Sequence, residues 1–118
     1  MSVEPDRSLD ILHVLRARID ADPSGVIDEV VLASAAHVTT PELRAVLQAQ
    51  AAGTPSQFVL HHRLDAVHRA LLADDLDLAD AARQWGFVHF ARFAAVYEDR
   101  HGQTPAETTA GRGLAQED

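Results

Sequence analysis

The sequence has 118 residues, of which 47% are hydrophobic and 24% are charged, and it contains no cysteine. This length and apolar content suit a single domain with a packed core and exclude a wholly disordered chain. The missing cysteine excludes disulfides and thiolate metal sites, and no apolar run approaches the roughly 20 residues that a membrane-spanning helix needs.

The charge balance is acidic, with 18 Asp and Glu residues against 10 basic residues, all of them arginine, and a net charge of −8. Such a charge repels a phosphate backbone at long range, whereas duplex-binding domains usually carry a basic stripe. Any DNA binding must therefore depend on local groups. Residues 1–6 lack the basic region and the apolar stretch of a secretory signal, so we expect a cytoplasmic location.

The first half of the chain predicts three helices. Residues 7–20 carry apolar residues at three-to-four spacing, and residues 27–36 form a short helix signal with acids in its first turn, where the helix dipole favours them. Thr39-Thr40-Pro41-Glu42 has the pattern of a capping box, so a third helix begins here and runs to about Ala51. The buried face of the first helix is predicted to be Leu9, Leu12, Leu15 and Ile19.

The second half predicts four more helices. Thr54-Pro55-Ser56-Gln57 repeats the capping pattern and begins the longest helix, at residues 55–73. Gly86 permits a left-handed turn between a short helix at 77–85 and a longer one at 88–100. A third capping pattern, Thr104 to Glu107, begins a last short helix, and residues 110–118 are predicted to be a loose tail. The inward face of the longest helix is predicted to be Phe58, Leu60, Leu64, Val67, Leu71 and Leu72.

Residues 30–58 and 79–108 repeat the same order of signals about fifty residues apart: short helix, tight turn, longer helix, capping pattern. Short helix, turn and longer helix form the outline of a helix-turn-helix. The predicted fold is therefore all-α, with about seven helices in two tandem helix-turn-helix subdomains joined by a long linking helix. We predict one domain over residues 1–118, with the first unit at about 7–53, the linking helix at about 55–73 and the second unit at about 77–109.

Several segments also match a known family. They are Arg63-Leu64-Asp65, Leu71-Leu72, Ala79 to Phe87, Phe93, Tyr97 and Gly102 to Pro105. On these residues the chain, from about Ser8 to Thr109, resembles the DNA-binding domain of the AraC/XylS family of bacterial transcription regulators. From Arg63 to Pro105 it lines up with the family pattern without a gap.

The resemblance implies that the second helices of both units lie in successive major-groove segments of double-stranded DNA, about one helical turn or roughly 34 Å apart. The two groove helices are then residues 40–51 and 88–100. Family members often carry a separate effector-binding domain. The 118 residues accommodate only the DNA-binding part, so we expect the effector-binding domain to be missing or to lie elsewhere.

The groove-facing residues depart from the family pattern. Base reading relies chiefly on arginine, glutamine and asparagine, and family members usually carry an arginine where this chain has Ala45 and Ala95. Lysines that normally contact phosphates after the second groove helix are replaced by Glu98 and Asp99, which repel phosphate. Glu42 could accept from cytosine, but we favour a role in the helix cap. The candidate DNA-binding residues are Thr40, Arg44, Ala45, Gln48, Val88, His89, Phe90, Arg92 and Ala95.

Two interpretations follow. In the first, the protein binds DNA weakly or as part of a larger assembly. Arg44 and Arg92 would each read or anchor one groove, alanines and Phe90 would contact thymine methyls, and the helix N-termini at Thr40 and Val88 would hold phosphates. A cluster of basic residues would add positive charge, and more of it below neutral pH. We favour a structural role for that cluster, in which Arg63 pairs with a nearby acid and the histidines are solvated. The cluster is His61, His62, Arg63, His68 and Arg69.

In the second interpretation, the domain has become a protein-interaction module that no longer reads DNA. Phe90 would then lie in an exposed apolar stripe with Val88 and the alanines of the same helix, suited to a partner helix or groove. An equally open alternative is that Phe90 packs inside the core with Phe87 and Phe93.

Nothing in the sequence indicates a cofactor, a metal site or an enzyme. The seven histidines include no pair at i,i+4 spacing with a supporting carboxylate, and no catalytic motif or phosphate-binding loop is present. The aromatic residues of the second half are predicted to be core residues. They are Trp85, Phe87, Phe93 and Tyr97.

Overall fold

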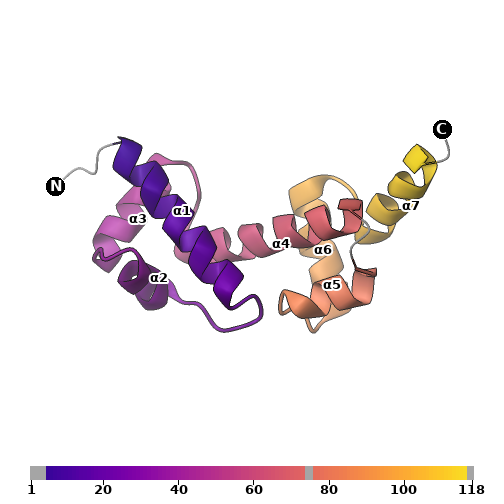
Figure 1. Ribbon diagram of the computed structural model, residues 1–118, viewed down its shortest axis with the longest axis horizontal. Coiled ribbons are helices and arrows are strands. Elements are labelled where there is room, and N and C mark those ends of the chain that lie inside the picture. Colours follow the sequence, from indigo (N-terminus) through magenta and orange to yellow (C-terminus); the bar gives the residue numbers. More distant parts are fainter. Residues whose placement is uncertain (1–4, 74–75, 117–118) are drawn as a thin grey trace. The chain divides into compact units, whose positions relative to one another are not determined.

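The computed structural model describes residues 5–73 and 76–116, with side chains described over 7–73 and 76–111. In this part of the chain there are seven helices and no strand, which confirms the predicted all-α fold class (Figure 1). The helices are α1 (Pro5–Ala21), α2 (Glu29–Ala35), α3 (Thr40–Ala49), α4 (Pro55–Ala73), α5 (Leu78–Gln84), α6 (Phe90–His101) and α7 (Pro105–Gln116).

The chain divides into two compact units, which we call unit 1 (residues 1–62) and unit 2 (residues 63–118). The boundary falls inside α4, the longest helix, so that the first part of α4 belongs to unit 1 and the remainder to unit 2. Each unit contains a short helix, a tight turn and a longer helix: α2 and α3 in unit 1, α5 and α6 in unit 2.

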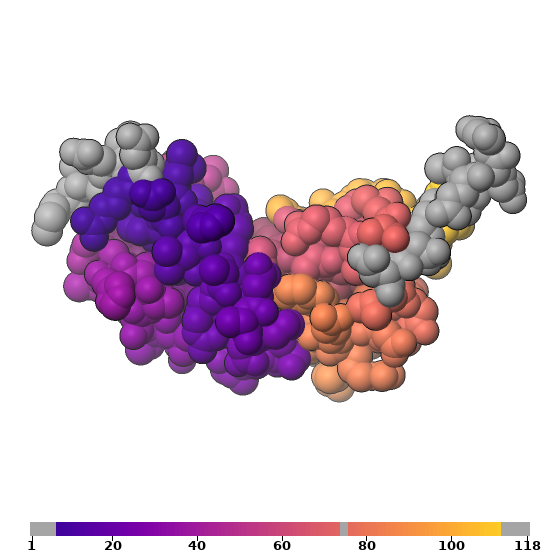
Figure 2. Space-filling model, in the orientation of Figure 1, coloured from indigo at the N-terminus to yellow at the C-terminus, as the bar shows by residue number. Residues whose placement is uncertain are grey.

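Unit 1 has its own apolar core. Helix α2 packs against both α1 and α3, and the atoms of α1, indigo in Figure 2, cover the near face of the unit. The predicted face of α1 is correct for three of its four residues, but Leu9 is 57% exposed and Ile11 is buried in its stead. The buried apolar residues of unit 1 are Ile11, Leu12, Leu15, Ile19, Ile27, Leu32, Ala33, Leu43, Val46, Leu47, Phe58 and Val59.

Unit 2 buries an aromatic row along α6. The Phe93 and Tyr97 rings lie one helical turn apart with centroids 5.6 Å from each other, and both side chains are almost fully buried. Helix α7 packs on α5 and α6. On α4 the predicted inward face is correct at Leu64, Val67 and Leu71, whereas Leu72 is 52% exposed. Aromatic pairs at this separation stabilise a core by about 0.5–1.5 kcal/mol beyond their buried area.

The two helix-turn-helix segments end their first helices with the same backbone hydrogen bonds. In unit 1 the N–H of Val38 donates to the carbonyl of Ala33 at 3.0 Å, and in unit 2 the N–H of Phe87 donates to the carbonyl of Ala82 at 2.9 Å. The chain reverses through positive φ at His37 (56°) and at Gly86 (87°). Glycine adopts that backbone freely, while histidine is strained there, so unit 1 makes the same turn at a higher conformational cost.

The structure shifts several predicted helix boundaries. Helix α2 begins at Glu29 because the carboxylate of Asp28 accepts from the N–H of Val31 and so caps it. Helix α3 ends at Ala49 since Ala51 takes a positive φ of 53°. The start of α6 moves from 88 to Phe90, because the preceding residue has an extended backbone.

The prediction of a loose tail at residues 110–118 is wrong as far as Gln116, where α7 ends; the last two residues lie outside the described part. The hydroxyl of Thr104 accepts from the N–H of Glu107, whose carboxylate accepts from the N–H of Thr104, and this capping box begins the helix firmly. Glycines inside a helix cost only about 1 kcal/mol each, and no proline follows to stop it, so the helix continues.

Candidate nucleic-acid interface

A capping box fixes the start of α3. The Thr39 hydroxyl accepts from the N–H of Glu42 at 3.2 Å, and the Glu42 carboxylate accepts from the N–H of Thr39 at 3.3 Å. Proline at position 41 is suited to the first turn, because it lacks only an N–H that would have no partner in the helix. Glu42 is therefore the cap residue that the sequence favoured, and its carboxylate oxygen is occupied within the helix.

Helix α3 is amphipathic. Leu43, Val46 and Leu47 face the core of unit 1, and the opposite face is exposed. Of the four α3 residues proposed for DNA binding, Arg44, Ala45 and Gln48 are exposed and Thr40 is half-buried in the first turn. The face that meets solvent thus carries one guanidinium and one amide, both of which can form hydrogen bonds with base edges.

The Arg44 guanidinium is held by an acid from the preceding helix. Its Nε donates to Oε2 of Glu29 at 2.9 Å and its Nη2 donates to Oε1 at 2.6 Å. These hydrogen bonds and the charge of Glu29 raise the pKa of Arg44 above its ordinary value, so the group stays cationic. The two side chains remain 58% and 32% exposed. This pair ties α2 to α3 across the turn while leaving part of the guanidinium accessible.

An open hollow of about 570 Å³ lies beside the exposed face of α3, within unit 1. The start of α4 forms part of it, where the Thr54 hydroxyl accepts from the N–H of Gln57 and the Gln57 side chain accepts in return. The hollow is lined by Arg44, Gln48, Ala51, Gly53, Thr54, Pro55 and Gln57. The polar groups of α3 therefore line a concave surface.

In unit 2, α6 exposes a more apolar face. Val88, in the turn, is 78% exposed, and Phe90, the first residue of α6, is 53% exposed. The Phe90 ring lies 5.8 Å from the ring of Phe93, so one side of it is covered and the other faces solvent. Burial of Phe90 in the core, left open by the sequence, is thus excluded. Further along the helix the side chains of Ala91, Arg92 and Ala95 are exposed.

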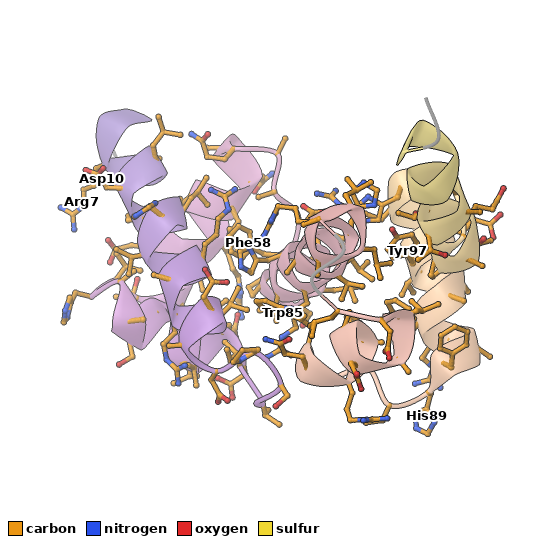
Figure 3. The ribbon with its side chains drawn as sticks, turned by 45° about the vertical axis from the view of Figure 1, so that its right-hand side comes forward. Arg7, Asp10, Phe58, Trp85, His89 and Tyr97 are labelled. Carbon is orange, nitrogen blue, oxygen red and sulfur yellow. The ribbon has the colours of Figure 1, made fainter. Side chains whose placement is uncertain are left out.

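Two polar groups lie at the start of α6. His89 is the N-cap residue, and its side chain makes no capping hydrogen bond and extends outward (Figure 3). Within the described residues no acid forms an ion pair with Arg92, which is exposed. Glu98 and Asp99 are exposed toward the end of the helix. On the exposed face of α6, the basic groups therefore lie in the N-terminal half and the acidic groups in the C-terminal half.

Arg100, near the end of α6, forms an ion pair within unit 2. Its Nε and Nη2 donate to the two carboxylate oxygens of Asp65 at 3.0 and 2.9 Å. Burial raises the pKa of Asp65, but the hydrogen bonds and charge of Arg100, with the charges of His101 and Arg69, outweigh burial and hold that pKa below its ordinary value. This bidentate pair fixes α6 on α4.

The expectation that the histidines of the basic cluster are solvated is wrong for His62 and His68. The side chain of His62 is 9% exposed and its Nε2 lies 2.7 Å from a carboxylate oxygen of Asp20. Nδ1 of His68 lies 2.7 Å from the Tyr97 hydroxyl, and its ring stacks on the ring of His101 with centroids 4.2 Å apart. These rings belong to the internal packing of each unit, so they supply no phosphate-binding patch.

The sequence does not predict that Glu29 is a partner of Arg44. As an acid in the first turn of the helix at 27–36, Glu29 is expected only to interact with the helix dipole. Fifteen residues separate the two side chains in the chain, and no local motif links them.

Among the described residues, no group of three or more His, Cys, Asp and Glu side chains is placed to hold a metal ion. None of the described helices combines the length and apolar character that crossing a membrane requires.

The model of a family described as a helix-turn-helix domain matches residues 32–111, which is more than half of the chain. No solved structure matches the chain. The matched region begins inside α2, runs through α3 to α6 and ends within α7, so it contains both helix-turn-helix segments.

Proposed function

Because the chain belongs to the AraC-type helix-turn-helix family, we propose that it binds double-stranded DNA through both units and thereby controls transcription. In this proposal α3 and α6 enter successive segments of the major groove. The residues that would contact DNA are Thr40, Arg44, Ala45 and Gln48 in unit 1, and Val88, His89, Phe90, Arg92 and Ala95 in unit 2.

The observation that carries the proposal is the repeated construction of the two segments. Leu43 and Leu47 of α3 are buried, as are Phe93 and Tyr97 at the corresponding positions of α6, fifty residues later. Burial of the same face in both helices leaves the same opposite face exposed. A DNA-binding helix-turn-helix offers that face to the base edges.

The chemistry of the exposed faces favours modest affinity. Arg44 is neutralised by Glu29, Arg92 is the cation of the second face, and the chain as a whole carries a net charge of −8. Few phosphates can then be neutralised. The alanines at 45 and 95 would contribute apolar contacts with thymine methyl groups. We therefore expect weak general binding, with selectivity confined to a few base pairs.

Titration of a labelled DNA duplex with the full chain, followed by fluorescence anisotropy at several salt concentrations, tests this function. A DNA-binding protein loses affinity steeply as salt rises, because each neutralised phosphate releases counterions with a slope of about −0.9 per phosphate. A chain that leaves the duplex unbound at low ionic strength would contradict the proposal.

One observation favours a second function, a module that binds a protein partner. Val88 and Phe90 are neighbouring large apolar residues with exposed fractions of 78% and 53%, and the face that continues from them is mostly alanine. Exposed apolar side chains of this kind often mark an interaction surface. The two functions predict different consequences of placing a charge at position 90.

Phe90→Asp separates them when it is combined with the duplex titration. In the module, the wild-type chain fails to bind duplex at any salt concentration, and the variant keeps its helical circular dichroism while losing association with the partner. In the DNA-binding protein, the wild-type chain binds duplex, and the variant binds less tightly because a carboxylate now faces the phosphates.

A further inference from the structure

The two hydrogen bonds between Glu29 and Arg44 suggest a specific role for the acid. We infer that Glu29 is a positioning residue that presents Arg44 to a guanine in the DNA segment bound by unit 1. The inference rests on the proposed DNA-binding function and adds to it a base identity, a residue outside the groove helix and a difference between the two units.

The hydrogen-bonding capacity of Arg44 supports a guanine contact. A guanidinium has five N–H donors. Glu29 accepts from Nε and from Nη2, so both N–H groups of Nη1 and the second N–H of Nη2 remain. These lie along the outer edge of the planar group and can donate two parallel hydrogen bonds. The major-groove edge of guanine offers two adjacent acceptors, O6 and N7, that match this pair.

The other bases fit less well. Adenine presents a donor beside its N7, and cytosine presents a donor, so each would place an N–H against the N–H groups of Arg44; thymine offers one acceptor. A phosphate oxygen is also a weaker competitor here, because the negative charge of Glu29 offsets that of the guanidinium. A neutral pair gains from matched hydrogen bonds more than from long-range charge.

The fold of the helix-turn-helix does not require this ion pair. The residues corresponding to Glu29 and Arg44 in unit 2 are Leu78 and Ala94, one at the start of α5 and one in α6, and they form no such pair. Unit 2 makes the same turn with the same backbone hydrogen bonds. Exposed ion pairs also add little to stability. What the pair does provide is a fixed orientation of the guanidinium on the exposed face of unit 1.

Selection of bound duplexes from a randomised DNA pool, with the full chain and its variants, tests the inference. The wild-type chain is expected to enrich one position in guanine. Arg44→Ala should lose that preference, by about fivefold to 150-fold in relative affinity. Arg44→Lys keeps the charge but not the planar fork, so it should retain the salt dependence and lose the preference.

Glu29→Gln distinguishes positioning from a purely structural role. Without the carboxylate, the guanidinium is released toward phosphates. The guanine preference should fall while general duplex affinity at low salt rises, with a salt slope steeper by about 0.9, the value for one phosphate. A structural role would instead lower affinity for all duplexes in proportion. Arg7→Ala removes an exposed arginine of α1 in the same unit; it is the charge-matched control for Arg44→Ala and should keep the guanine preference.

The outcomes separate the two claims. Duplex binding without any guanine preference, or a preference that survives Arg44→Ala, overturns the role of this pair and leaves DNA binding intact. Absence of duplex binding by the wild-type chain at low salt overturns the proposed function itself. Loss of guanine preference in Arg44→Ala and Glu29→Gln, but not in Arg7→Ala, supports the inference.

Discussion

The hydroxyl of Tyr97 lies 2.7 Å from Nδ1 of His68, so one buried phenol joins α6 to α4 inside unit 2. The same hydroxyl lies 2.8 Å from the hydroxyl of Thr108 on α7. Burial raises the pKa of Tyr97, against a smaller opposing effect of the bond to Thr108, so the phenol stays neutral. A single oxygen therefore connects the three helices that surround it.

Tyr97→Phe should destabilise the protein by about 1–3 kcal/mol, because the ring still fits but His68 and Thr108 lose a buried partner. The midpoint of urea unfolding is the measurement. Phe87→Leu, which alters a half-buried ring at the edge of the same row, should cost less. Equal stability of Tyr97→Phe and the wild type would show that the hydroxyl network contributes nothing.

The second prediction concerns acid sensitivity. Burial, followed by the charges of His68 and Arg100, lowers the pKa of His101 below its ordinary value of 6.5, and the carbonyl of Leu64 and the carboxylate of Asp65 offset this only in part. The unfolded chain then binds more protons than the folded one below about pH 6.5. Stability should thus fall as the pH is lowered from about 6.5 through the pKa of the folded state.

Urea unfolding at pH 7.5 and at pH 5.5 checks this prediction. His101→Gln cannot bind the proton, so its stability should change less between the two values than that of the wild type. His13→Gln, a change at an exposed histidine of α1, should keep the wild-type dependence. An undiminished pH effect in His101→Gln would assign the acid sensitivity to other groups.

A third prediction tests the capping box at α3. Thr39→Ala removes the acceptor for the N–H of Glu42 and should lower the free energy of unfolding by about 0.5–2 kcal/mol. Thr40→Ala, one residue later and inside the helix, provides the matched control and should have a smaller effect. If both alanine variants unfold at the same urea concentration, the side chain of Thr39 stabilises the protein no more than that of Thr40.

The turns give a fourth prediction. Gly86→Ala places a Cβ at φ 87° and should destabilise unit 2 by about 1–2 kcal/mol. His37→Gly relieves strain at φ 56° but makes the unfolded chain more flexible, so its net effect should stay below about 1 kcal/mol. Thermal unfolding of both variants measures the contrast. A Gly86→Ala protein as stable as the wild type would contradict it.

Features encoded within a few residues were predictable from the sequence. The caps at Thr39, Thr54 and Thr104 each occur three residues before a Glu or Gln, and all three form reciprocal hydrogen bonds. The positive φ at Gly86 and Gly102 likewise follows from glycine at the end of a helix. Local chemistry decides these elements, so one sequence suffices.

Contacts between helices were not predictable in the same way. Glu29 and Arg44, or His68 and Tyr97, come together only after the helices pack. Leu9 and Leu72 illustrate the converse, since each has the spacing of a core residue but is more than half exposed. Periodicity identifies an apolar face, while tertiary packing determines how much of that face is covered.

The exposed faces of α3 and α6 carry the residues proposed to contact DNA. The residue types there were known from the sequence, but whether Arg44 and Arg92 are available was not. In the structure Arg44 forms an ion pair with Glu29, whereas no acid among the described residues forms an ion pair with Arg92. The two units should therefore differ in salt dependence: Arg92 contributes net charge and Arg44 contributes hydrogen-bond geometry.

The most direct test is a double-mutant cycle in duplex binding, with wild type, Arg44→Ala, Arg92→Ala and the double variant titrated against one selected duplex at low salt. If both units bind DNA, each single substitution lowers duplex affinity by about fivefold or more. The affinity of the double variant is then lowered by the product of the two single factors. Duplex affinity that is unchanged in all three variants, or absent from the wild-type chain, would contradict DNA binding by the two units.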